Sequence, residues 1–208
     1  MSWWQQIYRR SVFGRPVVVV SGLPRSGTSM MMKMLESGGV PVWTDAVRAA
    51  DDQNPNGYYE LERIKDLDKP IDNSWLREGR GRAVKVISSL VEHLPAGNNY
   101  QVLFMNREMT EVLRSQGKML AQRGQGHDQA HDAALEAAYA LHLRRVRNLL
   151  AHDARFTAIS FDYADVVADP AAVATRIQAF LGADLDTGRM AAAVDGRLYH
   201  NRQTTPGA

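Results

Sequence analysis

The stretch that most constrains the fold is Val17 to Leu35, which reads VVVVSGLPRSGTSMMMKML. Four consecutive valines are typical of a strand buried on both faces, and the methionine-rich run after the loop is typical of a buried helix. Gly22 and Gly27 enclose four residues. This is the spacing of a P-loop, in which backbone N–H groups surround an anion at a helix amino end. The sequence therefore predicts a phosphate-binding loop in an α/β fold.

The loop differs from an ATP or GTP site in the position of its cation. Such sites continue Gly-Lys-Ser/Thr, and the lysine reaches the terminal phosphates. Here Thr28 stands in the lysine position, Ser29 follows it, and Arg25 places the strong cation inside the loop. This substitution argues against a Mg²⁺-dependent kinase, which we keep as a competing hypothesis.

A second apolar strand run leads into a helix at residues 101–120, QVLFMNREMTEVLRSQGKML. It contains an arginine and a serine eight residues apart, Arg107 and Ser115. The chain thus offers two strand-to-helix loops, each with one cation and hydroxyl donors, which suits a ligand with two separate anionic groups.

The loop residues Pro24 to Ser29, PRSGTS, resemble the phosphosulfate-binding loop of sulfotransferases. These enzymes use 3′-phosphoadenosine 5′-phosphosulfate (PAPS) as donor. Residues 101–120 resemble the family's 3′-phosphate segment, strand-Arg-Asp-Pro-x-Glu-Val-x-x-Ser-Gln, except that Glu108 and Met109 replace Asp-Pro. Residues 156–182 resemble the strand, tyrosine-containing turn and helix that follow in bacterial members.

The resemblance spans about residues 15 to 202 and implies a PAPS-dependent sulfotransferase of the bacterial type. It implies in-line transfer of a sulfuryl group to a hydroxyl or amine of a small-molecule or glycan acceptor, with PAP as product and no metal. Arg107 and Ser115 would hold the 3′-phosphate, and Arg197 and Arg202 would close over it from the C-terminal loop. The residues that would hold the 5′-phosphosulfate are Pro24, Arg25, Ser26, Gly27, Thr28 and Ser29.

The resemblance also implies catalytic roles. Arg25 would stabilise charge on the departing phosphate, and Lys85, in the strand AVKVIS, would assist the leaving group. In mammalian cytosolic members a histidine closely follows that lysine and acts as the base, but here the stretch reads Val-Ile-Ser. We therefore expect a carboxylate base downstream of the P-loop, and we favour Glu60 over Asp45.

Each of these residues also has a structural interpretation. The loop could be an ordinary glycine turn, Arg107 a strand-end cation, Lys85 an ion-paired lysine, and both carboxylates helix amino-end residues. A non-catalytic nucleotide-binding module is a further alternative, because it would keep both loops. His127 and His131 are four residues apart, but no third ligand is specified, so we expect no metal site.

The composition of the chain further limits its domain organisation, partners and location. The chain has 208 residues, 45% of them hydrophobic, and a net charge of +2. We expect one domain over 1–208, with a surface segment at 1–15 and a loop or tail at 196–208. The near-neutral charge argues against a nucleic-acid partner. The absence of cysteine agrees with a reducing, cytoplasmic location, and no apolar run reaches the ~20 residues of a membrane span. The sequence leaves open whether the protein forms a homodimer.

Alternating strand and helix patterns predict a three-layer P-loop fold around a central, mainly parallel sheet of about five strands flanked by helices. The expected strands are 17–21, 40–43, 83–87, 101–105 and 156–160. The expected helices are 27–38, 60–68, 110–123, 129–151, 170–181 and 186–194.

Overall fold

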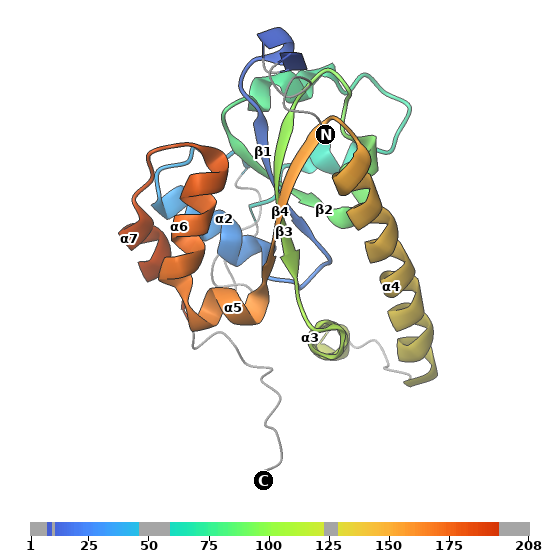
Figure 1. The fold of residues 1–208 in the computed structure, drawn as a ribbon. Coiled ribbons are helices and arrows are strands. Elements are labelled where there is room, and N and C mark those ends of the chain that lie inside the picture. The colour runs from blue at the N-terminus through green and yellow to red at the C-terminus, as the bar shows by residue number, and fades with distance from the viewer. Residues whose placement is uncertain (1–7, 10, 46–58, 123–128, 196–208) are drawn as a thin grey trace.

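The computed structural model describes residues 8–9, 11–45, 59–122 and 129–195, with side chains described outside 118–132. At its centre lies a four-stranded parallel sheet in the order β2-β1-β3-β4 (Figure 1). The strands are β1 (Val17–Gly22), β2 (Ala83–Ile87), β3 (Tyr100–Asn106) and β4 (Phe156–Asp162). The α/β class with a parallel sheet flanked by helices is therefore confirmed.

The register of the sheet brings the carboxyl ends of its strands together. Gly22 pairs with Ile87 of β2 and with Met105 of β3, and Met105 pairs with Phe161 of β4. The loops that leave β1, β3 and β4 therefore start side by side at one edge, which is where open α/β sheets bind ligands. Figure 1 shows α3 (Met109–Gln122) and α5 (Tyr163–Ala168) at this end of the sheet.

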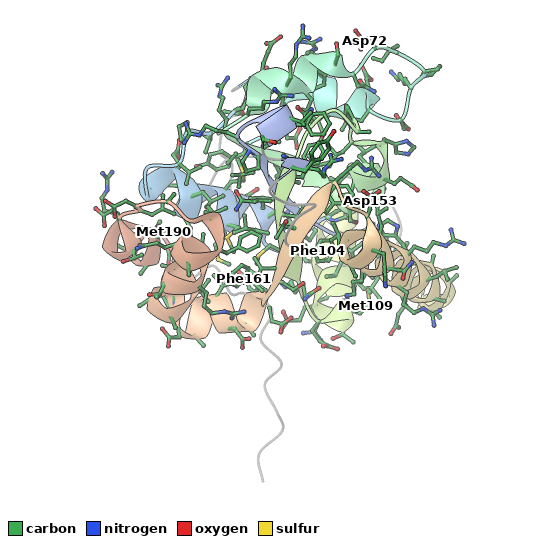
Figure 2. The ribbon with its side chains drawn as sticks, turned by 45° about the horizontal axis from the view of Figure 1, so that its top comes forward. Asp72, Phe104, Met109, Asp153, Phe161 and Met190 are labelled. Atoms are coloured by element: carbon green, nitrogen blue, oxygen red, sulfur yellow. The ribbon has the colours of Figure 1, made fainter. Side chains whose placement is uncertain are left out.

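Helices cover both faces of the sheet (Figure 1). On one face α4 (Gln129–His152) packs over Val17 and Val19, and on the other α2 (Thr28–Ser37) packs over Val18 and Val20. The four valines are therefore all buried, and each contributes roughly 1.5–3 kcal/mol relative to an exposed side chain. Two phenylalanines also lie on opposite faces of the sheet (Figure 2). Phe104 belongs to the core under α4, and Phe161 belongs to the core under α2, α6 and α7.

The C-terminal helices α6 (Pro170–Leu181) and α7 (Thr187–Ala192) follow from local sequence signals. Asp169 caps α6 by accepting a hydrogen bond from the Ala172 N–H, and Pro170 occupies the first turn, where a missing N–H costs nothing. Gly182 ends the helix in the left-handed conformation. The predicted range 170–181 is therefore correct.

The expected strand 40–43 is wrong. The segment makes one isolated parallel bridge, between Val42 and Ala83, and the described sheet has four strands. The Ala83 N–H donates to the Pro41 carbonyl, and the Trp43 N–H donates to the Ala83 carbonyl. Because Pro41 has no N–H and Gly39 has a φ of 93°, the pairing does not extend toward the N-terminus.

Four further differences concern short helices. The expected helix 60–68 is a short 3₁₀ helix, η1 (Glu62–Asp66). Two other 3₁₀ helices, η2 (Ser74–Gly79) and η3 (Ser88–His93), and the helix α5 were not predicted. All are at most six residues long, so their periodic patterns are too brief to recognise.

The amino-terminal segment is helical at residues 8–9 and 11–13, and the more apolar Trp3, Trp4 and Ile7 lie outside the described residues. The Arg9 side chain attaches this segment to the loop before β3. It donates hydrogen bonds to the Asn99 side chain and to backbone carbonyls of that loop. Among the described helices, none is both long and apolar enough to span a bilayer.

Candidate functional site

The loop between β1 and α2 has a conformation that requires glycine at both ends. Gly22 has a φ of 156° and Gly27 a φ of 99°. A Cβ at Gly22 would lie 2.4 Å from Ser26 Oγ, and one at Gly27 would lie 2.5 Å from the Tyr163 ring. Both distances are shorter than van der Waals contact allows, so the loop backbone can curl this tightly only with glycine at these positions.

The amino end of α2 has the features of an anion site. No side chain of the described residues caps it, and the first intrahelical bond runs from the Met31 N–H to the Gly27 carbonyl. The N–H groups of the first turn thus have no carbonyl partner within the helix. Ser26 Oγ is also buried without a hydrogen-bond partner in the described part of the chain. N–H groups at a helix amino end that have no partner within the helix favour a bound anion.

Arg25 occupies the left-handed region, with a φ of 70°, although it is not glycine. This conformation costs about 1–2 kcal/mol for an ordinary residue. The Arg25 carbonyl accepts a hydrogen bond of 3.1 Å from Arg107 Nη1. The Arg25 side chain turns toward α3, where its Nε donates to Ser115 Oγ at 2.9 Å. The two predicted loops therefore meet in space.

Arg107 lies just beyond the carboxyl end of β3 and is held on several sides. Its Nε lies 2.9 Å from Glu111 Oε2, in an ion pair whose side chains are 8% and 5% exposed. Its guanidinium stacks over the Tyr163 ring, 4.1 Å from the ring centre. The orientation of the guanidinium is thus fixed before any ligand arrives.

Tyr163 is a site residue that sequence reasoning noted only as part of a turn. It starts α5 directly after β4 and packs its ring between Gly27 and Arg107. Burial raises the pKa of its phenol, so the side chain is neutral at physiological pH. Its position after a strand, like that of the P-loop and of Arg107, was the signal that could have identified it.

Lys85 approaches the same helix end from β2. Its Nζ lies 3.5 Å from Ser29 Oγ, in the first turn of α2. Lys85 pairs in the sheet with Val20, two residues before Gly22. A cation and the helix amino end thus flank the same position, where a 5′-phosphosulfate is expected to bind.

The two candidate carboxylate bases are joined by backbone and side-chain hydrogen bonds. The Glu60 carbonyl accepts from the Asp45 N–H at 3.1 Å, and the Asp45 carboxylate accepts from the Glu62 N–H at 2.6 Å. The Glu60 carboxylate lies 3.2 Å from Lys65 Nζ. These contacts tie both residues to η1, and their catalytic roles stay predictions. Residues 46–58 between them lie outside the described residues.

A serine–histidine pair was missed entirely. Ser88, directly after β2, is 2% exposed, and its Oγ lies 2.8 Å from His142 Nε2 on α4. Burial lowers the pKa of His142, so its imidazole is neutral at physiological pH. The pair ties α4 to η3, and neither residue has a local pattern that marks it.

The other predicted residues are placed as follows. Pro24 is exposed on the loop, and Thr28 is half-buried as the first residue of α2. Arg197, Arg202 and His127 lie outside the described residues, as does the side chain of His131. Within the described residues, no group of three or more His, Asp or Glu could hold a metal ion.

Together these features define an α/β protein of the P-loop type with a candidate anion site at the carboxyl edge of its sheet. No protein-family model matches its sequence, and no curated protein matches it. Solved structures match its fold. One is a sulfotransferase domain from the curacin biosynthetic pathway, with a TM-score of 0.52 and 14% identity over 88% of this chain and 89% of that chain.

Another is a sulfotransferase domain from the olefin synthase of Synechococcus PCC 7002. It has a TM-score of 0.51 and 18% identity over 89% of this chain and 79% of that chain. The chain thus has the fold of sulfotransferase domains, which confirms the resemblance at the level of architecture.

Proposed function

We propose that the protein is a sulfotransferase that takes a sulfuryl group from PAPS and transfers it to a hydroxyl or amine of a small-molecule or glycan acceptor. The observation that carries the proposal is the meeting of two arginine-bearing loops at one sheet edge, joined by the Arg107–Arg25 and Arg25–Ser115 hydrogen bonds. A nucleotide with phosphates on its 3′ and 5′ oxygens needs two adjacent anion sites of this kind.

The residues present fit such a donor. The buried, unpartnered hydroxyl of Ser26 and the cradle formed by Gly22 and Gly27 indicate a loop built around an anion. The loop N–H groups, Thr28 and Ser29 would hold the 5′-phosphosulfate, with Lys85 beside them. Arg107 and Ser115 would hold the 3′-phosphate. When bound, the donor supplies an activated sulfuryl group.

The chain's own contribution is mainly electrostatic. The helix amino end and Lys85 would stabilise negative charge that grows on the leaving phosphate during in-line displacement. Because these groups are fixed in the folded chain, they need little reorganisation during the reaction. A base must also accept the proton of the attacking hydroxyl or amine, and Glu60 is our first candidate for this base.

The proposal is tested by incubating the purified chain with PAPS and a panel of phenols, alcohols, amines and oligosaccharides, and measuring PAP release. We expect acceptor-dependent release that falls at least about 100-fold in Lys85→Met, because oxyanion-type donors contribute 10²–10³ in rate. PAP binding without turnover on any acceptor would support the non-catalytic module. Mg²⁺-dependent ATP binding in place of PAP binding would support the kinase.

A further inference from the structure

Glu60, the candidate base, lies between two residues that pack into opposite cores. Tyr59 packs against the core under α2, whereas Leu61, which is 4% exposed, belongs to the core under α4. The segment that hydrogen-bonds to Glu60 pairs with β2, the outer strand of the sheet, at the bridge between Val42 and Ala83. The chain at Glu60 therefore passes from one face of the sheet to the other around this outer strand.

The backbone of Tyr59 has a conformation that is uncommon for a residue other than glycine. Its φ is 49°, in the left-handed region, and among the described non-glycine residues only Arg25 also has a positive φ. Residues in such conformations are held there by the surrounding structure, and they cluster at functional sites. Because this turn directly precedes Glu60, it sets the direction in which the chain continues into the candidate base.

The Tyr59 side chain supplies a contact that holds this turn. Its hydroxyl donates a hydrogen bond of 2.6 Å to Glu36 Oε2, in the last turn of α2. Burial and, to a smaller extent, the contact with Glu36 raise the pKa of the phenol, so the hydroxyl stays protonated and can donate throughout the physiological pH range. Tyr59 is thereby attached to the helix whose amino end is the candidate anion site.

We propose that Tyr59 is a positioning residue that fixes the direction of the Glu60 carboxylate by holding the turn before it. The inference rests on the proposed function, because it takes Glu60 as the base that accepts the proton of the acceptor. The Glu60 carbonyl accepts hydrogen bonds from the Asp45 N–H, at 3.1 Å, and from Thr44 Oγ1, at 2.9 Å. The Glu60 carboxylate lies 3.2 Å from Lys65 Nζ, and its side chain is 27% exposed. The carboxylate is therefore held in place and is accessible to an acceptor.

The contact between Tyr59 and Glu36 lies at the surface, where the Glu36 side chain is 43% exposed. Substitutions at such positions usually change stability little. Loss of the contact should thus leave the fold intact. It should still lower turnover, because a displacement of about 1 Å in a reacting group can reduce the rate by as much as 100-fold.

Tyr59→Phe tests the inference, because it removes the hydroxyl and keeps the ring. We expect kcat to fall about fivefold to tenfold with the acceptor that supports the fastest PAP release. The affinity for adenosine 3′,5′-bisphosphate, measured by calorimetry, should change less than about twofold. Tyr139→Phe is the matched control, because it removes a hydroxyl that bonds to Gln116 between α4 and α3, and it should leave kcat unchanged. A kcat equal to that of the wild type in Tyr59→Phe would overturn the inference.

A Glu60→Asp background separates positioning from a general structural effect. Its carboxylate is already displaced by the loss of one methylene, so adding Tyr59→Phe should lower kcat by less than about a further twofold. The same fivefold to tenfold loss in both backgrounds would overturn the inference, because Tyr59 would then not act through Glu60. Lys33→Met, which removes an ion-pair partner of Glu36 at 3.6 Å, should leave kcat unchanged, since the Tyr59 contact remains.

Amide hydrogen exchange gives a readout that does not depend on turnover. The Asp45 N–H donates to the Glu60 carbonyl, and the Glu62 N–H donates to the Asp45 carboxylate. In Tyr59→Phe we expect both N–H groups to exchange at least about threefold faster, because the turn before Glu60 is released. Unchanged exchange would overturn the inference even if kcat falls. A wild type that releases no PAP with any acceptor would contradict the proposed function, whereas faster exchange in Tyr59→Phe would still support the positioning of Glu60.

Discussion

Arg107 Nη1 donates a hydrogen bond of 3.1 Å to the backbone carbonyl of Arg25. The bond connects the Arg25 peptide of the first loop, which lies in the left-handed region, to the arginine of the second, so the two loops form one hydrogen-bonded unit. Tyr163 extends this unit to β4, because its ring packs against both Gly27 and Arg107. Sites held in this way need little rearrangement on binding, which favours affinity.

Gly27→Ala tests the steric part of this unit. Its Cβ would meet the Tyr163 ring at 2.5 Å, and its φ of 99° is unfavourable for alanine. We expect a loss of about 2–4 kcal/mol in the free energy of unfolding, measured by urea denaturation. Gly97→Ala is the control, since a Cβ there meets nothing within 4 Å. A Gly27→Ala chain as stable as the control would contradict the packing described.

Glu111→Gln tests the buried ion pair. Because it removes the carboxylate that is paired with the buried Arg107 guanidinium, we expect a destabilisation of about 2–4 kcal/mol. Affinity for adenosine 3′,5′-bisphosphate should stay equal or rise, since the pocket gains net positive charge. Glu62→Gln, which breaks an exposed pair with Lys65, should change stability little. Stability that falls equally in both variants would argue against a special role for the buried pair.

The lowered pKa of His142 predicts how the free energy of unfolding depends on pH. Burial lowers its pKa in the folded chain, while Glu92 on η3 raises it and Arg145 on α4 lowers it, both to a smaller extent. The unfolded chain therefore binds a proton first, and stability falls as the pH drops below about 6.5, the ordinary pKa of histidine.

In His142→Gln this part of the acid-side decline should disappear from thermal melts between pH 5 and pH 8. His152→Gln, at an exposed position, should leave the decline as it is. An unchanged pH profile in His142→Gln would mean that the contact with Ser88 does not depend on the neutral imidazole.

Glu60→Gln tests the proposed base. The substitution keeps the size of the side chain and removes its ability to accept a proton, so turnover should be lost while affinity for adenosine 3′,5′-bisphosphate is preserved. Glu62→Gln, two residues away, is the control for a local disturbance of η1. Turnover that matches the wild type would remove Glu60 from this role.

Local sequence patterns were sufficient to predict much of the fold and the positions of the two loops. The valine run, the glycine spacing and the strand before Arg107 each lie within a few residues, so each could be recognised without knowledge of the fold. The prediction of a strand at 40–43 was wrong, because it relied on the apolar character of the segment and underestimated the effect of Pro41 on sheet pairing.

Contacts between distant residues could not be predicted in this way. Arg25 and Ser115 are 90 residues apart, and Ser88 and His142 are 54 apart. The direction of the Arg25 side chain is set by where α3 lies, which no local pattern specifies. The assignment of Arg25 to the 5′ side from its place in the loop stays a prediction, and the contact of its Nε with the helix of the second loop could not be foreseen.

The central claim is that the joined loops bind a nucleotide with phosphates on both the 3′ and 5′ oxygens. Calorimetric titration of the whole chain with adenosine 3′,5′-bisphosphate, beside a titration with ATP and Mg²⁺, tests it most directly. We predict saturable one-to-one binding of the bisphosphate and no heat of binding with ATP and Mg²⁺. Binding of ATP and Mg²⁺ with no response to the bisphosphate would contradict the account.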